Sequence, residues 1–473
     1  MQISLFLPEL VLIFSALAFF FLSLLKGQKA FVRPLAVVLA GLALIASGYA
    51  YGREGELFFS AYRIDAFSQL YKIIIALGLF IVFWMGAGLR GIEEELTAEY
   101  YMFLTISALG LVFMGSAVEL LTIIISLEMS SFALYIVIPF RRQRGYRRQM
   151  EAGIKYVLFG AVSTGITLYG MSYIFGLTHT TYLAELVKTV PPLLPHQPMA
   201  LIGMVLMLSG FFYKLALFPM HFWAPDVYEG AANETSGFVA TLPKVGAVAL
   251  LIRLVSLAGM DTAQFTYVLA VIAVISMTVG NLSALVQDDI KRLLAYSSIA
   301  HAGYVMVGIL SGNETGMSSA LYYIAGYLLM NLTCFYVVYN ISAAGDNVSF
   351  EDLKGLYKKS PLLAFCLAVS AFGMAGIPPT VGFTGKFLLF TGAIQKGLYA
   401  LVILAVINTG ISAFYYLKMV RAAYSIEAVD DSKIKLGFST SVLGFLLIAA
   451  IILTGIFPQS FVELTKEAIR VVQ

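Results

Sequence analysis

The sequence predicts an all-α polytopic membrane protein with about fourteen transmembrane helices. Three observations lead to this fold class. The 473 residues are 60% hydrophobic and only 12% charged, with a mean hydropathy of +0.88, whereas a soluble domain is about 25% charged. Apolar stretches long enough to cross a bilayer recur along most of the chain. Basic residues gather in alternate connections between these stretches, as the positive-inside rule expects.

Each expected span contains about 20 mainly apolar residues, the length that a helix needs to cross the hydrocarbon core. A group of three N-terminal spans is followed by ten spans that divide into two sets of five, and by one last span. In chain order the expected spans are 3–25, 33–51, 66–89, 100–117, 119–140, 152–176, 199–222, 237–258, 265–286, 293–311, 316–342, 361–391, 398–420 and 437–457.

Charge in the connections predicts the orientation. Connections that follow odd-numbered spans carry eighteen basic residues, including the arginine run at 141–148, and the other connections and the tail carry six. Because cytoplasmic connections are enriched in Lys and Arg, the odd-numbered connections are expected in the cytoplasm and both termini on the outer side. The longest outer connection, 177–198, contains four prolines and is expected to be a stiff surface connector.

Composition also excludes several kinds of site. Cys334 and Cys366 both lie inside apolar runs, which excludes a disulfide framework, an iron–sulfur cluster and a zinc site built on thiolates. The four histidines are too scattered for a haem or copper centre, and the net charge of +3 is too small to indicate nucleic-acid binding. Gly385-Lys386 fails the phosphate-binding loop pattern, because position 380 is threonine and position 387 is phenylalanine.

Six basic residues fall inside the expected spans, and three of these lie near a span's end. Lys72, Lys155 and Arg253 are within about two turns of an end. Their long stems are therefore expected to carry the charge to the membrane interface.

Lys214, Lys244 and Lys386 lie deeper in apolar sequence. A lysine near the midplane costs at least about 2.5 kcal/mol, so it normally faces a hydrated cavity or an ionic partner. Glu128, in the middle of 119–140, is an available partner. One interpretation is structural: Glu128 neutralises a single lysine, which leaves two unexplained. The other is a relay of protonatable groups, since burial disfavours a charged ammonium and a nearby carboxylate favours it.

Two of these lysines lie beside helix breakers. Lys214 is followed by Pro219, and Lys386 follows Pro378-Pro379 in a glycine-rich stretch. Unwound backbone at membrane depth persists only where it is buried in protein or lines water. Paired interrupted helices are a sequence indication of a transport site between repeats.

The spacing of the two lysines predicts an inverted repeat. Lys386 follows Lys214 by 172 positions, an interval of five spans, so the second copy of spans 4–8 would be spans 9–13 in the opposite orientation. The same interval carries Glu128 to position 300, next to His301, which adds His301 to the candidate relay. The expected divisions are an N-terminal three-helix segment (1–99), the first repeat (100–258), the second repeat (259–422), and a C-terminal helix and tail (423–473).

Four stretches carry a resemblance to a known family. They are SLE at 126–128, KLALFPMHFWAPDVYEGA at 214–231, DIKRLLAYSSIAH at 289–301 and AGIPPTVGFTGKF at 375–387. With these stretches the chain resembles, over nearly its whole length, the antiporter-like membrane subunits of respiratory complex I, the bacterial NADH–quinone oxidoreductase. Lys386 and the short tail after the last span make it most similar to the subunit N branch of that family.

The resemblance implies roles for the candidate site residues. In the family, a glutamate at the position of Glu128 pairs with a lysine at the position of Lys214 near the inner half-channel. A lysine at the position of Lys244 connects the two repeats, and a lysine at the position of Lys386 serves the outer half-channel. The implied function is proton translocation from the cytoplasm to the outside, coupled to NADH oxidation and quinone reduction in other subunits.

The resemblance also implies partners and a location. The expected partners are the other membrane-arm subunits of complex I, including similar antiporter-like subunits, and the lipid bilayer of the bacterial inner membrane. NADH, FMN, iron–sulfur clusters and quinone are expected in partner subunits, and no cofactor or redox chemistry is expected in this chain.

Two other functions remain open at the level of sequence. A subunit of a multi-subunit cation/proton antiporter would need several oxygen ligands together for sodium, but lysines occupy the positions where such ligands would be most useful. A non-catalytic membrane scaffold would tolerate Lys→Met at the three deep positions, because removing buried charge often stabilises a protein.

Overall fold

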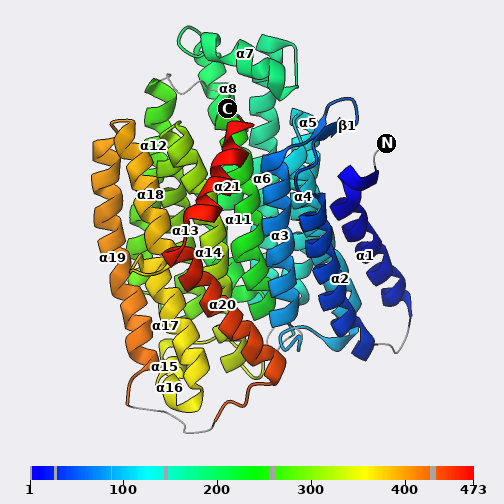
Figure 1. The fold of residues 1–473 in the computed structure, drawn as a ribbon, viewed down its shortest axis with the longest axis vertical. Helices are drawn as coiled ribbons and strands as arrows, with labels where there is room; N and C mark the ends of the chain where they lie inside the picture. Colours follow the sequence, from blue (N-terminus) through cyan, green and yellow to red (C-terminus); the bar gives the residue numbers. More distant parts are fainter. Residues whose placement is uncertain are drawn as a thin grey trace.

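The computed structural model is a bundle of helices that run roughly along the long axis of the molecule (Figure 1). It describes residues 3–25, 29–86, 88–142, 147–255, 257, 263–426 and 433–472. Within these residues, thirteen helices are long and apolar enough to cross a membrane. The predicted fold class, an all-α polytopic membrane protein, is confirmed.

The elements follow one another in four groups. The N-terminal group is α1 (Leu7–Leu24), α2 (Lys29–Ala50), β1 (Gly55–Leu57), β2 (Tyr62–Ile64) and α3 (Ala66–Met85). The next is α4 (Thr97–Ser116), α5 (Leu120–Val137), α6 (Arg147–Thr178), α7 (Leu183–Leu193), α8 (Pro198–Met207), α9 (Ser209–Leu215), α10 (Trp223–Gly230) and α11 (Asn233–Val255). The third is α12 (Ala263–Leu285), α13 (Ile290–Leu310), α14 (Glu314–Ile341), α15 (Phe350–Leu353), α16 (Leu356–Lys359), α17 (Pro361–Ala375), α18 (Val381–Gln395) and α19 (Tyr399–Ala423). The last is α20 (Phe438–Ile456) and α21 (Gln459–Arg470).

The twelfth expected span, 361–391, forms two helices instead of one. Helices α17 and α18 each contain 15 residues and therefore rise only about 22 Å each, less than the roughly 30 Å hydrocarbon core. They follow each other along the long axis (Figure 1), so the pair accounts for the crossing that the thirteen longer helices leave out.

Helices α11, α13 and α14 form the centre of the bundle. Their most apolar windows are 100%, 94% and 94% buried, compared with 39% for the window that contains α1. Helix α11 packs against α3 and α4 on one side and against α13 and α14 on another. The centre therefore joins the N-terminal group to the second and third groups, and it contains Lys244 on α11 and His301 on α13.

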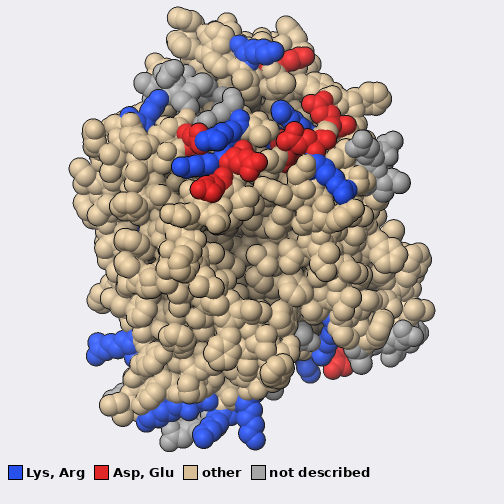
Figure 2. Space-filling model, in the orientation of Figure 1, with Lys and Arg blue, Asp and Glu red and all other residues tan. Residues whose placement is uncertain are grey.

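Charged residues are concentrated at the two ends of the bundle (Figure 2). The lower end shows mostly Lys and Arg, the band near the upper end mixes both signs, and the surface between them is almost free of charge. The lower end, called the basic face below, contains α15 and α16 with Lys354, Lys358 and Lys359. An uncharged belt between two charged ends is what a bilayer-spanning surface requires.

The second and third groups share a local feature at opposite ends of the bundle. Glu119 precedes α5, caps it by accepting from Leu121 N (3.1 Å) and Thr122 N (2.8 Å), and forms an antiparallel bridge with Tyr182. Asp289 precedes α13, caps it by accepting from Arg292 N (2.9 Å), and forms an antiparallel bridge with Ser349. The first bridge lies beside α7 at the upper end, and the second beside α15 at the basic face.

The expectation of a stiff surface connector at 177–198 did not include a helix. Residues Leu183–Leu193 form helix α7, with Pro191 and Pro192 near its end. Leu183, Leu186 and Val190 are buried and repeat at helical spacing. Tertiary packing of this apolar stripe outweighs the low helix propensity of the prolines. Helices α10 and α21, outside the expected spans, were also not predicted.

The expectation that Lys72 and Arg253 reach the membrane interface is also wrong. Lys72 Nζ lies 2.6 Å from Glu9 Oε1, and both side chains are almost fully buried. The same Glu9 oxygen accepts a hydrogen bond from the Tyr62 hydroxyl at 2.5 Å. Arg253 Nη2 donates to both carboxylate oxygens of Asp65 at 2.9 Å. These pairs bind α1 to α3 and α3 to α11, so they hold the N-terminal helices on the central bundle.

Lys155, the third lysine expected at the interface, is partly exposed and forms ion pairs near the basic face. Its Nζ lies 2.6 Å from Glu151 and 2.5 Å from Asp226.

Removing one partner of the buried Lys72–Glu9 pair should destabilise the N-terminal helices. Lys72→Met leaves the Glu9 carboxylate buried without its cation, a change that costs about 3–5 kcal/mol in comparable pairs, whereas replacing both partners is often neutral. Thermal unfolding of the detergent-solubilised protein should therefore show a lower midpoint for Lys72→Met than for Lys72→Met/Glu9→Met. Equal midpoints for the two variants would contradict this account.

Candidate functional site

The first interruption of the bundle follows α9. Helix α9 ends at Leu215, and Ala216 takes the left-handed conformation with φ of 59°. The carbonyls of a helix's last turn have no partner within the helix and carry a partial negative charge. Lys244, 1% exposed on α11, donates from Nζ to the Leu215 carbonyl at 2.7 Å. A buried ammonium therefore completes the end of this short helix.

The second interruption, after α17, is completed in the same way. Helix α17 ends at Ala375, and Gly376 takes the left-handed conformation with φ of 86°, which favours glycine. Lys386 on α18 is 3% exposed, and its Nζ donates to the carbonyls of Met374 (2.9 Å) and Ala375 (3.3 Å). The ammonium also lies 4.7 Å from the ring centroid of Tyr304, within cation–π range.

Lys214 and Glu128 lie close enough to interact electrostatically but do not touch. Lys214 is 1% exposed, and its Nζ has no hydrogen-bond partner among the described residues. Glu128 acts on it through space, while the Glu128 carboxylate accepts a short hydrogen bond from the Thr164 hydroxyl. The structure therefore brings Glu128 and Lys214 into one region without forming an ion pair.

His301 is held by two tyrosines that sequence reasoning missed. Its Nδ1 lies 2.6 Å from the Tyr323 hydroxyl, and its Nε2 lies 2.9 Å from the Tyr416 hydroxyl. The Tyr416 hydroxyl also makes a short hydrogen bond with Ser297. Both Lys244 and Lys386 are within electrostatic range of the imidazole. His301 is thus the group that both helix-capping lysines can influence.

A second polar cluster lies beside Lys386. Asn281 donates to the Tyr304 hydroxyl (3.1 Å) and to the Asn408 carbonyl (3.0 Å), and it accepts from the Tyr415 hydroxyl (3.0 Å). The only available signal in the sequence was the presence of Asn and Tyr inside apolar spans. Twenty-seven tyrosines in the chain make that signal too common to select these residues.

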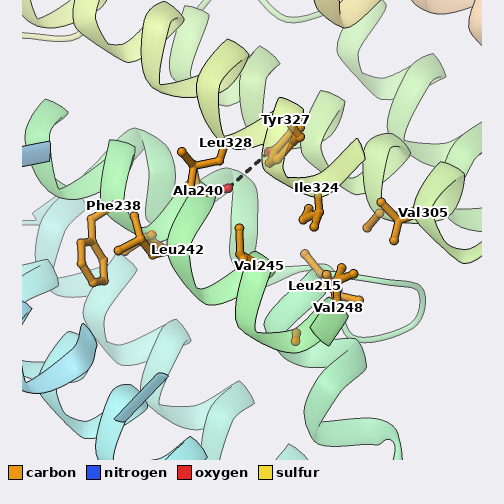
Figure 3. Packing of buried hydrophobic residues seen from close by; sticks show 14 of the residues in the cluster. Leu215, Phe238, Ala240, Leu242, Val245, Val248, Val305, Ile324, Tyr327 and Leu328 are labelled. Carbon is orange, nitrogen blue, oxygen red and sulfur yellow. Dashed lines mark hydrogen bonds between the residues drawn. The ribbon is translucent and has the colours of Figure 1, made fainter. Parts of the chain in front are cut away.

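Apolar side chains surround the central groups. Figure 3 shows Leu215, Val248, Val305 and Ile324 packed together where α9, α11, α13 and α14 meet. The Tyr327 hydroxyl reaches through this packing to the Ala240 carbonyl of α11 at 3.3 Å. Because such surroundings have a low effective dielectric, changes of charge on the lysines act over long distances here.

The predicted interval of 172 positions does not match the two interruptions. Lys214 precedes the first interruption, whereas Lys386 follows the second. Lys244, from a neighbouring helix, performs at the first interruption the capping that Lys386 performs at the second. Lys214 and Lys386 therefore differ in their surroundings. Lys214 lies in the helix before the first interruption, whereas Lys386 lies in the helix after the second.

Ion pairs bind helix α10 to α6 of its own group and to α13 of the third group. Asp226 accepts from Lys155 of α6 at 2.5 Å and from Arg292 of α13 at 2.7 Å. Arg292 also donates to Glu229 at 2.9 Å. Burial alone would raise the pKa of the Asp226 carboxyl, but the hydrogen bonds and positive charges of Lys155 and Arg292 outweigh burial and lower that pKa.

Comparison with known proteins identifies the family. The family described as NADH:quinone oxidoreductase/Mrp antiporter, TM, matches residues 117–412. A protein of Opitutus terrae named NADH-quinone oxidoreductase subunit N 2 is 49% identical over 96% of this chain and 95% of its own length. The chain belongs to the subunit N family of bacterial NADH-quinone oxidoreductases. A relative of the same name in Solidesulfovibrio magneticus is 47% identical over 99% of both chains.

Solved structures agree with the subunit N family's fold. A chain of respiratory complex I from Thermus thermophilus is 29% identical, with a TM-score of 0.82 over 96% of this chain and 98% of that one. A chain of the Mrp complex from Dietzia is 17% identical, with a TM-score of 0.88, covering 100% of this chain and 98% of that one, which shows a shared fold.

The ion pairs of Asp226 predict that the stability of this subunit N family member depends on pH. A lowered folded pKa means that the carboxylate contributes stability above its unfolded pKa of about 3.9 and loses it as the pH falls through the folded value. Asp226→Asn should therefore lower the thermal unfolding midpoint at pH 7, and the difference from the unmodified protein should shrink below about pH 4. A difference that is unchanged in acid would contradict the assignment.

Proposed function

We propose that this chain translocates protons across the membrane as a subunit of NADH-quinone oxidoreductase. The relay consists of Glu128, Lys214, Lys244, His301 and Lys386. The observation that carries the proposal is the pair of interrupted helices, each completed by a buried lysine ammonium, with an imidazole in electrostatic range of both. We infer the complex in which this relay works from the name of a relative that is 49% identical to this chain.

Each capping lysine couples protonation to backbone structure. A protonated Lys244 or Lys386 is attracted by the partial negative charge of a helix end and donates to its carbonyl. Loss of the proton removes the charge and weakens the cap. The same change alters the electrostatic potential at His301, so the two interruptions can influence each other through it. Glu128 exerts the corresponding influence on Lys214.

The energies involved have the required size. Moving one proton against about 150 mV costs about 3.5 kcal/mol, from 2.3 kcal/mol per 100 mV. Forming or losing one close charge pair at an effective dielectric of 20 is worth about 4 kcal/mol. One change of pairing at the relay can therefore balance the translocation of one proton.

The proposed direction is from the basic face to the opposite end. The basic face has the excess of Lys and Arg expected of a cytoplasmic surface, and α1 begins and α21 ends toward the upper end in Figure 1. In this orientation Glu128 and Lys214 serve the inner half-channel, Lys244 and His301 connect the halves, and Lys386 serves the outer half-channel.

The proposed repeat comprises residues 100–258 and 259–422, between the N-terminal segment 1–99 and the C-terminal 423–473. The matching acidic caps and bridges at Glu119 and Asp289 support this division, because they occur at opposite ends of the bundle. The two lysine-capped interruptions support it as well.

The proposed partners are the other membrane-arm subunits of the complex, including similar antiporter-like subunits, in the bacterial inner membrane. NADH, FMN, iron–sulfur clusters and quinone belong to partner subunits in this proposal. This chain's own residues supply protonatable groups only. Among the described residues, no three His, Cys, Asp or Glu side chains come together as a metal site.

Lys214→Ala tests the relay directly. In inverted membrane vesicles, NADH-driven acidification and NADH–quinone activity should both fall by at least about tenfold, since one positioned proton-transfer group contributes about 100-fold or more. Native gels should show an assembled complex. Lys188→Ala, at an exposed lysine of α7, is the matched control and should leave both activities unchanged. An assembled Lys214→Ala complex with both activities intact would indicate that the chain is a non-catalytic scaffold.

Glu128→Gln tests the carboxylate. Glutamine keeps an oxygen that can accept from the Thr164 hydroxyl but cannot carry the charge that acts on Lys214. Coupled turnover should fall severalfold while assembly is retained. Normal proton pumping in this variant would remove Glu128 from the relay.

A further inference from the structure

Glu234 is a buried carboxylate that the proposed relay does not use. It is the second residue of α11 and only 1% exposed. One oxygen accepts from Gly91 N at 3.0 Å, and the other, Oε2, has no hydrogen-bond partner within the described part of the chain. Burying a carboxylate with an unbonded oxygen is costly unless nearby charges compensate it.

Two cations compensate Glu234 without binding it. Lys291 and Arg141 are both within electrostatic range of the carboxylate. Lys291, fully buried, donates to the Ala231 carbonyl at 2.7 Å, and Arg141 donates to the Glu229 carbonyl at 2.8 Å. Their hydrogen bonds are thus directed at the end of α10. The two cations offset part of the cost of burying the negative charge of Glu234, while Oε2 stays free to accept a proton.

Other buried hydroxyl groups lie near the same carboxylate. Tyr100 is 1% exposed and lies within electrostatic range of Glu234, and its hydroxyl lies beside that of Thr235. Buried polar atoms without a protein partner are usually bridged by water. Gly91 permits the close approach of α11, because a Cβ there would lie 2.8 Å from the Ala232 Cβ and 3.2 Å from Oε2.

The position of Glu234 lies between the basic face and the relay. Its neighbours Gly91 and Arg141 belong to connections after the third and fifth spans, which lie at the basic face. Lys244 follows ten residues later on the same helix, about 15 Å along its axis. The Tyr228 hydroxyl, 3.3 Å from Ser298 Oγ, and the Tyr327 hydroxyl at Ala240 lie along this interval.

We propose that Glu234 takes up protons at the basic face and delivers them toward Lys244. The carboxylate binds a proton at Oε2, and that proton then passes through hydroxyl groups and water to the neutral amine of Lys244. The transfer regenerates the carboxylate and produces the ammonium that caps α9. This inference rests on the proposed function and adds its loading residue on the basic face.

Glu234→Gln separates this role from a structural one. Glutamine fills the same volume and keeps an oxygen for Gly91 N, but it cannot bind and release a proton. NADH-driven acidification of inverted vesicles should fall at least fivefold in an assembled complex. Glu314→Gln, at a partly exposed glutamate paired with Arg470, is the matched control and should pump normally.

Tyr100→Phe provides a second test that does not depend on the glutamine variant. The only side-chain partner of its hydroxyl is the neutral Thr235 hydroxyl among the described residues, so its removal leaves no buried charge unpaired. The proposal expects at least a twofold slower acidification. Tyr71→Phe is the matched control, because that buried hydroxyl bonds the Leu111 carbonyl away from Glu234.

The outcomes separate this proposal from the one on which it rests. Slower acidification in Glu234→Gln, or in Tyr100→Phe if the glutamine variant does not assemble, would support Glu234 as the loading residue. Normal acidification in an assembled Glu234→Gln complex would overturn the proposal. If Glu234→Gln does not assemble, normal acidification in Tyr100→Phe would overturn it. Lys214→Ala is measured in parallel: if it also pumps normally, the relay itself fails, whereas a loss in Lys214→Ala alone rejects only Glu234.

Discussion

The bond from a buried lysine to the carbonyl end of an interrupted helix is the interaction on which the centre of this protein depends. Lys244 completes α9, Lys386 completes α17, and Lys291 binds the carbonyl that follows α10. In hydrocarbon, an unpaired carbonyl and an unpaired ammonium are each unfavourable, and together they satisfy each other. The interruptions and the lysines therefore require one another. Protonation of the lysine stabilises the backbone at the helix end, and loss of the proton weakens it.

The remaining structure surrounds this centre and holds it in place. Apolar residues of α9, α11, α13 and α14 pack around it (Figure 3). Buried pairs such as Lys72–Glu9 and Arg253–Asp65 hold the N-terminal helices against α11. Ion pairs of Asp226 and Glu229 bind α10 to both α6 and α13. A low dielectric and rigid surroundings let a change of one charge act on a neighbour that it does not touch.

Most of the fold could be predicted from sequence, but the partners of the charged residues could not. Hydropathy located the spans, because span length and composition are local properties, although the seventh forms α8 and α9 and the twelfth forms α17 and α18. Lys72 and Arg253 were misjudged, because their partners Glu9 and Asp65 come from distant segments. Helix α7 was missed for a related reason: its proline-rich sequence is helical only when its apolar stripe is packed.

The sequence by itself determined that the chain crosses a membrane many times, that its basic connections share one face, and that Glu128, Lys214, Lys244, His301 and Lys386 are unusual where they stand. Each conclusion follows from the free-energy cost of placing a polar group in hydrocarbon, which depends on each residue and its place in the span. Only the tertiary structure decided which carbonyl each lysine binds, that Lys214 does not touch Glu128, and that Tyr323 and Tyr416 hold His301. Those contacts join helices far apart in the chain, and the packing of the bundle sets them.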